Sequence, residues 1–126
     1  MDSNNRDLVI PWDKQEPWEF LIFLGMWLED KDIEKSLYCY ERACLDSSLA
    51  RWYAARLLMK LKRYDEAIYY LEKDYDEGNF ILLYMIAKCY FMKGNFEYAD
   101  KILNNIIMSN PKNPAALALK NKIKNK

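Results

Sequence analysis

The sequence predicts an all-α protein of three helix hairpins followed by one covering helix. A pattern of apolar and small residues occurs three times, starting at Pro17, Ser48 and Phe80, with offsets of 31 and then 32 residues. A repeat of this length indicates stacked helix hairpins that bury their apolar faces against one another. No segment alternates apolar and polar residues with a period of two, so strands are not expected. The third copy is the clearest, and its pattern residues are Leu83, Ile86, Ala87, Tyr90, Gly94, Ala99, Leu103, Ile106 and Pro111.

The arm and the helices of the first half are predicted from apolar runs and from the prolines that separate them. Residues 1–16 are polar apart from Leu8-Val9-Ile10 and Pro11-Trp12, which predicts an extended arm. Pro17 suits the first position of a helix because its missing amide hydrogen has no partner there. The expected helices of the first half are 17–29, 32–46 and 49–61.

The later helices are expected at 64–76, 79–92, 95–108 and 113–124. Gly78 and Gly94 are predicted to close helices in the left-handed conformation. The last helix should cover the third hairpin with Ala115, Leu119 and Ile123 and present lysines on its other side. Pro114 is predicted at a first helical position. Asparagines are predicted to cap three helix starts, namely Asn79, Asn95 and Asn113.

Alanines are predicted where the two helices of a pair cross, because a larger side chain would force the helices apart. These are Ala55, Ala67, Ala87 and Ala99.

Composition excludes several classes of protein. Nineteen basic and nineteen acidic residues cancel, so nothing global indicates a nucleic acid or an anionic membrane surface as partner. The apolar run at 18–28 is too short to span a bilayer, and the start of the chain lacks a secretory signal. We expect a soluble intracellular protein, cytoplasmic or nuclear. With no histidine and no CxxC pair, we expect no metal, no cofactor and no disulfide, and buried thiols at Cys39, Cys44 and Cys89.

No arrangement of residues indicates catalysis. The commonest general base is missing because the chain has no histidine, and no nucleophile motif of the GxSxG type occurs. Three acid pairs, Glu29-Asp30, Asp65-Glu66 and Asp76-Glu77, are expected to be solvated surface near helix ends. The prediction is a non-enzymatic protein.

Over residues 17–113 the repeats resemble the tetratricopeptide repeat (TPR) family. The chain departs from the family pattern at Ser36 (usually alanine), at Lys62 (usually glycine), and at Ser48 and Asn79 (usually proline). The resemblance implies a right-handed superhelix with repeats at about 17–47, 48–79 and 80–113. With a covering helix at about 113–124, the TPR domain would span 17–126.

The resemblance also implies a concave groove lined by the first helix of each pair. We expect this groove to bind a helical or extended segment of another protein, with acidic residues that meet Arg56 and Lys88. Trp52 and Tyr84 are the expected anchors, although both could instead pack within the superhelix. The predicted groove residues are Leu21, Trp52, Arg56, Met59, Lys60, Tyr84, Lys88 and Met92.

One known TPR activity is not expected. Family members that bind chaperone tails use a clamp of lysines, asparagines and an arginine. The equivalent positions of this chain hold residues that donate no charged hydrogen bond: Leu21, Gly25, Tyr53, Ile81 and Met85.

The first repeat is expected to leave apolar surface exposed unless something covers it. Either the arm 1–16 or a second chain could do so, and the sequence favours a symmetric homodimer. The predicted self-association residues are Trp18, Phe20, Phe23, Leu24 and Trp27.

A narrower resemblance concerns residues 63–71 and 83–90. These stretches look like the amino-terminal dimerisation region of anaphase-promoting-complex scaffold subunits, which implies a subunit of a cell-cycle ubiquitin ligase. The alternative is a holding chaperone, because small three-repeat TPR proteins that hold secretion substrates are similar in length and repeat count.

Overall fold

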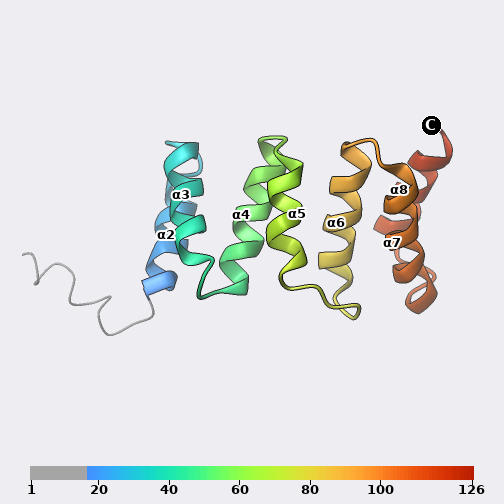
Figure 1. Cartoon of the computed structure of the whole chain (residues 1–126), viewed down its shortest axis with the longest axis horizontal. Coiled ribbons are helices and arrows are strands. Elements are labelled where there is room, and N and C mark those ends of the chain that lie inside the picture. Colours follow the sequence, from blue (N-terminus) through green and yellow to red (C-terminus); the bar gives the residue numbers. More distant parts are fainter. Residues whose placement is uncertain (1–16) are drawn as a thin grey trace, which may run out of the picture. The chain divides into compact units, whose positions relative to one another are not determined.

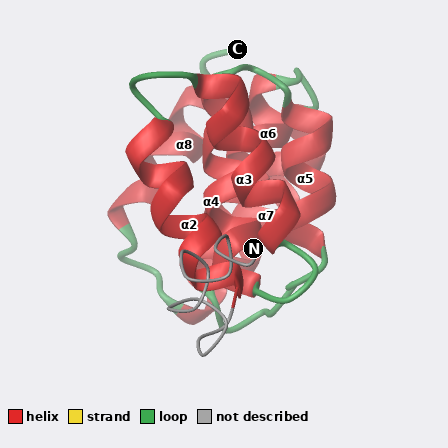
Figure 2. Cartoon of the chain, turned by 90° about the vertical axis from the view of Figure 1, so that its left-hand side faces the viewer, coloured by secondary structure: helices red, strands yellow, loops and turns green. Residues whose placement is uncertain are grey.

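The structure is a computed structural model that describes residues 17–126. Within this range the chain forms helices, turns and loops and no strand, so the predicted all-α class is confirmed (Figures 1 and 2). The predicted arm 1–16 lies outside the described residues. The helices are α2 (Pro17–Leu28), α3 (Ile33–Ala43), α4 (Ser48–Lys60), α5 (Tyr64–Glu72), α6 (Phe80–Met92), α7 (Phe96–Ser109) and α8 (Pro114–Lys124).

The chain forms two compact units, Met1–Leu57 and Leu58–Lys126. In the first unit, α2 packs against α3 as a hairpin, and most of α4 follows. In the second unit, α6 and α7 form a hairpin, α5 packs against α6, and α8 covers α7 and also touches α6. The hairpins predicted from the repeats are therefore seen at α2–α3 and α6–α7.

Side-chain caps begin most of the helices. The carboxamide oxygens of Asn79, Asn95 and Asn113 each accept the amide hydrogen three residues further on, at 3.1, 3.2 and 3.1 Å. Pro114 then occupies the first turn of α8, as predicted. Asp32 and Ser47 cap α3 and α4 in the same way, at 3.2 and 3.1 Å. Each cap satisfies an amide that has no partner inside its helix.

The predicted end of the fourth helix and the predicted conformation of Gly78 are both wrong. The helix expected at 64–76 ends at Glu72. Among the described residues, the left-handed region is occupied only at Lys62 and Gly94. The acids that follow Glu72 lie at the negative end of the helix dipole, which disfavours its extension. Asp76 instead accepts the amide hydrogen of Gly78 at 2.9 Å, and this local turn replaces the left-handed one.

Lys62 and Gly94 close α4 and α6 with the same turn. The amide of Lys62 donates to Met59 at 3.0 Å and that of the next residue donates to Leu58 at 2.8 Å. Around Gly94 the equivalent bonds reach Phe91 and Tyr90 at 3.0 and 2.9 Å. The backbone φ is 63° at Lys62 and 89° at Gly94. Lys62 therefore holds a conformation that suits glycine and costs an L-residue about 1–2 kcal/mol.

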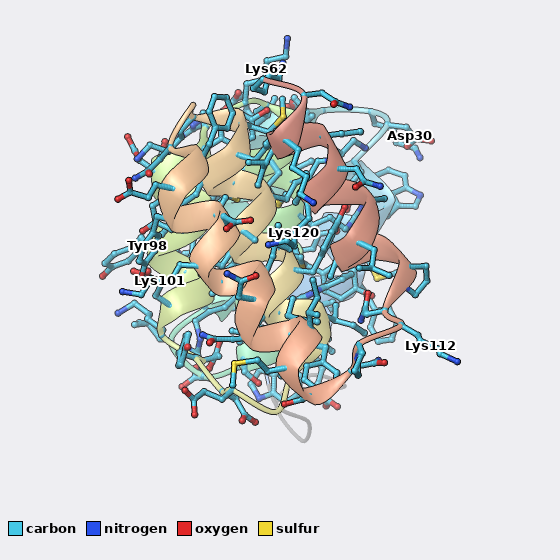
Figure 3. All side chains as sticks on the ribbon, turned by 90° about the vertical axis from the view of Figure 1, so that its right-hand side faces the viewer. Asp30, Lys62, Tyr98, Lys101, Lys112 and Lys120 are labelled. Carbon is cyan, nitrogen blue, oxygen red and sulfur yellow. The ribbon has the colours of Figure 1, made fainter. Side chains whose placement is uncertain are left out.

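We expect Lys62→Gly to stabilise the protein by about 0.5–1 kcal/mol, because relief of this strain exceeds the entropy that glycine loses on folding. The Lys62 side chain points into solvent, so little else is lost (Figure 3). The reciprocal change, Gly94→Ala, should cost about 1 kcal/mol of stability. A Cβ there meets nothing within 4 Å, so the cost comes only from the left-handed backbone conformation. Urea unfolding followed by circular dichroism measures both, and a loss of stability in Lys62→Gly would contradict the assignment.

The alanines predicted at helix crossings, Ala55, Ala67, Ala87 and Ala99, are all completely buried. The covering helix also forms, but one of its predicted core residues is wrong. Ala116 and Leu119 face the core, whereas Ala115 is exposed.

Lys120 belongs to the packing of α8 and is not part of a solvated lysine face. Its ammonium donates to Asp100 at 2.9 Å and to Asn104 at 2.7 Å, both on α7. Figure 3 shows Lys120 between the two helices, while Tyr98 and Lys101 point away from the far side of α7. These two bonds fasten α8 onto α7.

Candidate functional site

The predicted groove residues fall in different units. Leu21, Trp52 and Arg56 belong to the first, and Met59, Lys60, Tyr84, Lys88 and Met92 belong to the second. Leu21 and Met59 are half-buried, and Lys60 is exposed. Each unit presents a surface of its own.

In the first unit, Arg56 is held by an ion pair. Its guanidinium donates to Glu29 Oε2 at 2.6 Å, and the Glu29 side chain is only 17% exposed. The hydroxyl of Tyr40 donates to the same carboxylate oxygen. The prediction that Glu29 is solvated surface is therefore wrong, because the end of α2 places it against Tyr40 on α3 and Arg56 on α4. An acidic partner at Arg56 would have to compete with Glu29.

Aromatic rings surround this ion pair. Tyr40 stacks on Tyr53 with ring centroids 5.4 Å apart, and Trp52 meets Tyr53 edge-on at 5.2 Å. The Arg56 guanidinium lies 5.9 Å from the Trp52 ring and 5.6 Å from that of Tyr53. Burial raises the pKa of Tyr40, and its hydrogen bond to Glu29 raises the pKa further, so the phenol stays protonated as a donor. Trp52 is half-buried and contacts Tyr53, so part of its ring stays accessible, and its role as an anchor for a partner stays a prediction.

Gly25 packs against α3 and does not face a groove. A Cβ built at Gly25 would lie 2.5 Å from Tyr40 Cε1, so only glycine fits. Ser36 is completely buried and donates to the Gly25 carbonyl at 2.6 Å. The serine that departs from the family pattern therefore ties α3 to α2. A glycine in the middle of a helix costs about 1 kcal/mol of stability relative to alanine. A glycine at such a position is therefore the signal in the sequence that another helix comes close.

The outer face of α2 carries exposed apolar side chains, as predicted. Phe23 is 70% exposed, Trp27 is 59% exposed and Phe20 is 37% exposed. The other two predicted self-association residues, Trp18 and Leu24, are half-buried. The ammonium of Lys31 lies 4.2 Å from the centroid of the Trp27 ring. Large apolar side chains exposed together on one helix are typical of an interaction surface.

In the second unit, one face of α6 carries a stripe of residues at helical spacing: Ile81, Tyr84, Lys88 and Met92. Ile81 is 68% exposed and Met92 is 46% exposed, while Tyr84 and Lys88 are half-buried. Within residues 17–126 no acidic side chain pairs with Lys88. Its neighbour Lys93 differs, since it pairs with Asp65 at 2.5 Å. We call these four residues the α6 stripe.

Cys39 and Cys89 are poor nucleophiles. Cys39, Cys44 and Cys89 are buried, as predicted. Burial raises the pKa of the Cys89 thiol to about 12 and also raises that of Cys39. Thiolate is the reactive form, so these thiols are structural at neutral pH. In the described part of the chain no cluster of three metal-ligating side chains occurs.

The raised pKa of Cys89 predicts a loss of stability in alkali. The folded state holds the thiol proton to about pH 12, whereas the unfolded chain releases it near pH 9.0. Stability from this group is complete below pH 9 and falls as the pH rises above it, by at most about 1.4 kcal/mol per pH unit. Urea unfolding at pH 7, 9 and 10 measures the decline, which should be smaller in Cys89→Ala. Equal declines in both proteins would show that Cys89 is not the cause.

None of the helices described is both long and apolar enough to cross a lipid bilayer. A search of curated proteins gives no match for this chain. Residues 58–123 match the family model of the tetratricopeptide repeat, which covers more than half of the chain. The match includes α5, α6, α7 and most of α8, the helices that carry the turn at Gly94 and the buried alanines of the second unit. The chain therefore belongs to the tetratricopeptide repeat family.

Proposed function

We propose that this protein is a non-enzymatic scaffold that binds an amphipathic helical segment of another protein on the α6 stripe. Membership of the tetratricopeptide repeat family supports a protein partner. The observation that carries the proposal is the stripe itself, with two apolar side chains and one tyrosine around Lys88, which pairs with no acidic side chain of residues 17–126. A helix that lays its apolar face on such a surface is a common mode of recognition.

The chemistry of the α6 stripe defines the segment. Ile81 and Met92 offer apolar surface at the two ends, and Tyr84 is a half-buried aromatic anchor. Lys88 lies between them and is itself half-buried, so a carboxylate that reaches it is partly shielded from water. Such a pair is worth more than an exposed one. The segment should therefore place an Asp or Glu near the middle of its apolar face.

Two model peptides test this proposal, one amphipathic helix with a central Glu on its apolar face and the same helix with Lys. We expect the Glu peptide to bind about tenfold more tightly, measured by fluorescence anisotropy. Lys88→Glu should reverse that preference. The matched control is Lys101→Glu, the same charge change at an exposed residue of α7, and it should leave the preference unchanged. Equal binding of the two peptides would refute this role of the α6 stripe.

Self-association is the second part of the proposed function. The exposed Phe23 and Trp27 on α2 support it, because the largest apolar patch on a protein surface is often an interaction site. We expect light scattering to report a dimer at micromolar concentration or above. A monomer mass with intact helicity up to about 300 µM would remove this part and leave the peptide-binding part standing.

The narrower placement in the anaphase-promoting complex, a ubiquitin ligase, rests on the resemblance of residues 63–71 and 83–90 and stays a prediction. The alternative, a holding chaperone, also stays a prediction. A complex subunit should purify with its neighbours in fixed stoichiometry, as mass spectrometry of the affinity-purified chain would show. A holding chaperone should instead keep an otherwise insoluble client in solution.

A further inference from the structure

The exposed face of α2 has opposite charges at its two ends. Within Pro17–Leu28 the only charged residue is Glu19, which lies in the first turn and is exposed. At 100° per residue Glu19 shares a face with Phe23, Met26 and Trp27, all of which are exposed. Lys31 lies just beyond the other end of the helix, with its ammonium over the Trp27 ring. The order along the face is therefore acid, aromatic pair, base.

We propose that a second copy of this chain covers this face, with the two α2 helices antiparallel about a twofold axis level with residue 25. The inference rests on the self-association in the proposed function and specifies its geometry. Residue 25 is the midpoint between Phe23 and Trp27, and also between Glu19 and Lys31. One axis therefore places Phe23 against Trp27 of the partner subunit and Glu19 against Lys31 of the partner subunit. The twofold symmetry forms each of these contacts twice in the dimer.

Charge decides between the antiparallel and the parallel arrangement. Glu19 and Lys31 are roughly 18 Å apart along the helix direction at 1.5 Å per residue, so neither can compensate the other within one copy. A parallel pair would set Glu19 against Glu19 and Lys31 against Lys31, which is repulsive. The antiparallel pair converts both contacts into attractions. Asp30 pairs with Lys31 at 3.4 Å within the same copy and is 85% exposed, so it weakens this attraction, and the charge reversals below measure how much of it remains.

The size of the patch predicts a weak dimer. The exposed parts of Phe23, Met26 and Trp27 amount to roughly 300–400 Å² per copy, since an aromatic side chain carries about 150–250 Å². A stable interface usually buries about 1,200 Å² or more in total. The dimer should therefore dissociate on dilution, and its charged ends should have a visible effect on its affinity.

Sedimentation equilibrium of the full chain between about 1 and 300 µM tests the arrangement. Glu19→Lys and Lys31→Glu should each raise the dimer dissociation constant about fivefold or more, because each creates two like-charge contacts. The double variant should return to the affinity of the natural chain. The matched control is Lys35→Glu, the same charge change on α3 at a side chain that is 75% exposed, and it should have no effect. Circular dichroism confirms that every variant is folded.

The outcomes separate this inference from the proposed function. If the natural chain dimerises but the two reversals leave its affinity unchanged, the antiparallel arrangement is overturned and self-association stands. If the double variant fails to recover, the pairing of Glu19 with Lys31 is overturned. If the natural chain is a monomer throughout, a second copy is not the occupant of this face, and the arm 1–16 or another protein is. Binding of peptides to the α6 stripe is measured separately and survives all three.

Discussion

Gly25→Ala is expected to lower the free energy of unfolding by about 2–3 kcal/mol, the upper part of the range for overpacking a filled core. The added Cβ would lie 2.5–3.0 Å from three atoms of the Tyr40 ring. That ring cannot move aside, because it is completely buried, stacks on Tyr53 and is bonded to Glu29. The better helix propensity of alanine returns only about 1 kcal/mol. Urea unfolding followed by circular dichroism measures the change.

Gly78→Ala is the matched control. A Cβ at Gly78 meets only Asp76 Oδ1, at an ordinary contact distance of 3.5 Å, and the residue is exposed. We expect this change to be neutral within about 0.5 kcal/mol. A second test combines Gly25→Ala with Tyr40→Leu. The double variant should lose less stability than the two single variants together, because the smaller leucine side chain makes room for the methyl group. Strict additivity would mean that the two residues are not in contact.

The elements that could be predicted from the sequence are those with local causes. Asn79, Asn95 and Asn113 cap the helices that follow them, because a cap needs only the amide three residues further on. The buried alanines follow from the period of the repeat. The end of α5 was predicted wrongly although its cause is local, because the acids beyond Glu72 oppose the helix dipole.

The features that escaped prediction depend on contacts between helices. Glu29 looks like an ordinary acid at a helix end, and only the positions of Tyr40 on α3 and Arg56 on α4 make it a half-buried bridge between helices. The expectation that Arg56 meets acidic residues of a partner stays a prediction, and such a partner would have to compete with Glu29. The lysines of the last helix were expected only on its side away from the core, whereas Lys120 bonds to Asp100 and Asn104 across the α7–α8 crossing. The α6 stripe stays a prediction from the repeat pattern, and its exposure is what supports the proposed binding.

Arg56→Gln is expected to destabilise the first unit by about 2 kcal/mol. The change leaves the Glu29 carboxylate, 17% exposed, with Tyr40 but without its cation. Loss of one partner costs about 3–5 kcal/mol in fully buried pairs, and the partial exposure of this pair reduces the penalty. Glu29→Gln should cost less, about 1 kcal/mol, because Arg56 is 35% exposed and water can solvate its charge. The double variant should cost less than the sum of the two, since neither charge is then left unpaired.

Arg63→Gln supplies the comparison, because Arg63 pairs with Glu66 at 2.8 Å where the side chains are 39% and 49% exposed. Exposed pairs of this kind contribute about 0.2–1 kcal/mol, and salt screens them. The cost of Arg56→Gln should therefore exceed that of Arg63→Gln and should persist at high salt, as urea unfolding with and without added sodium chloride would show. If the two costs are equal, Glu29 does not hold Arg56 in place. The guanidinium would then be available to an acidic partner, and the sequence-based prediction for Arg56 would apply to the first unit after all.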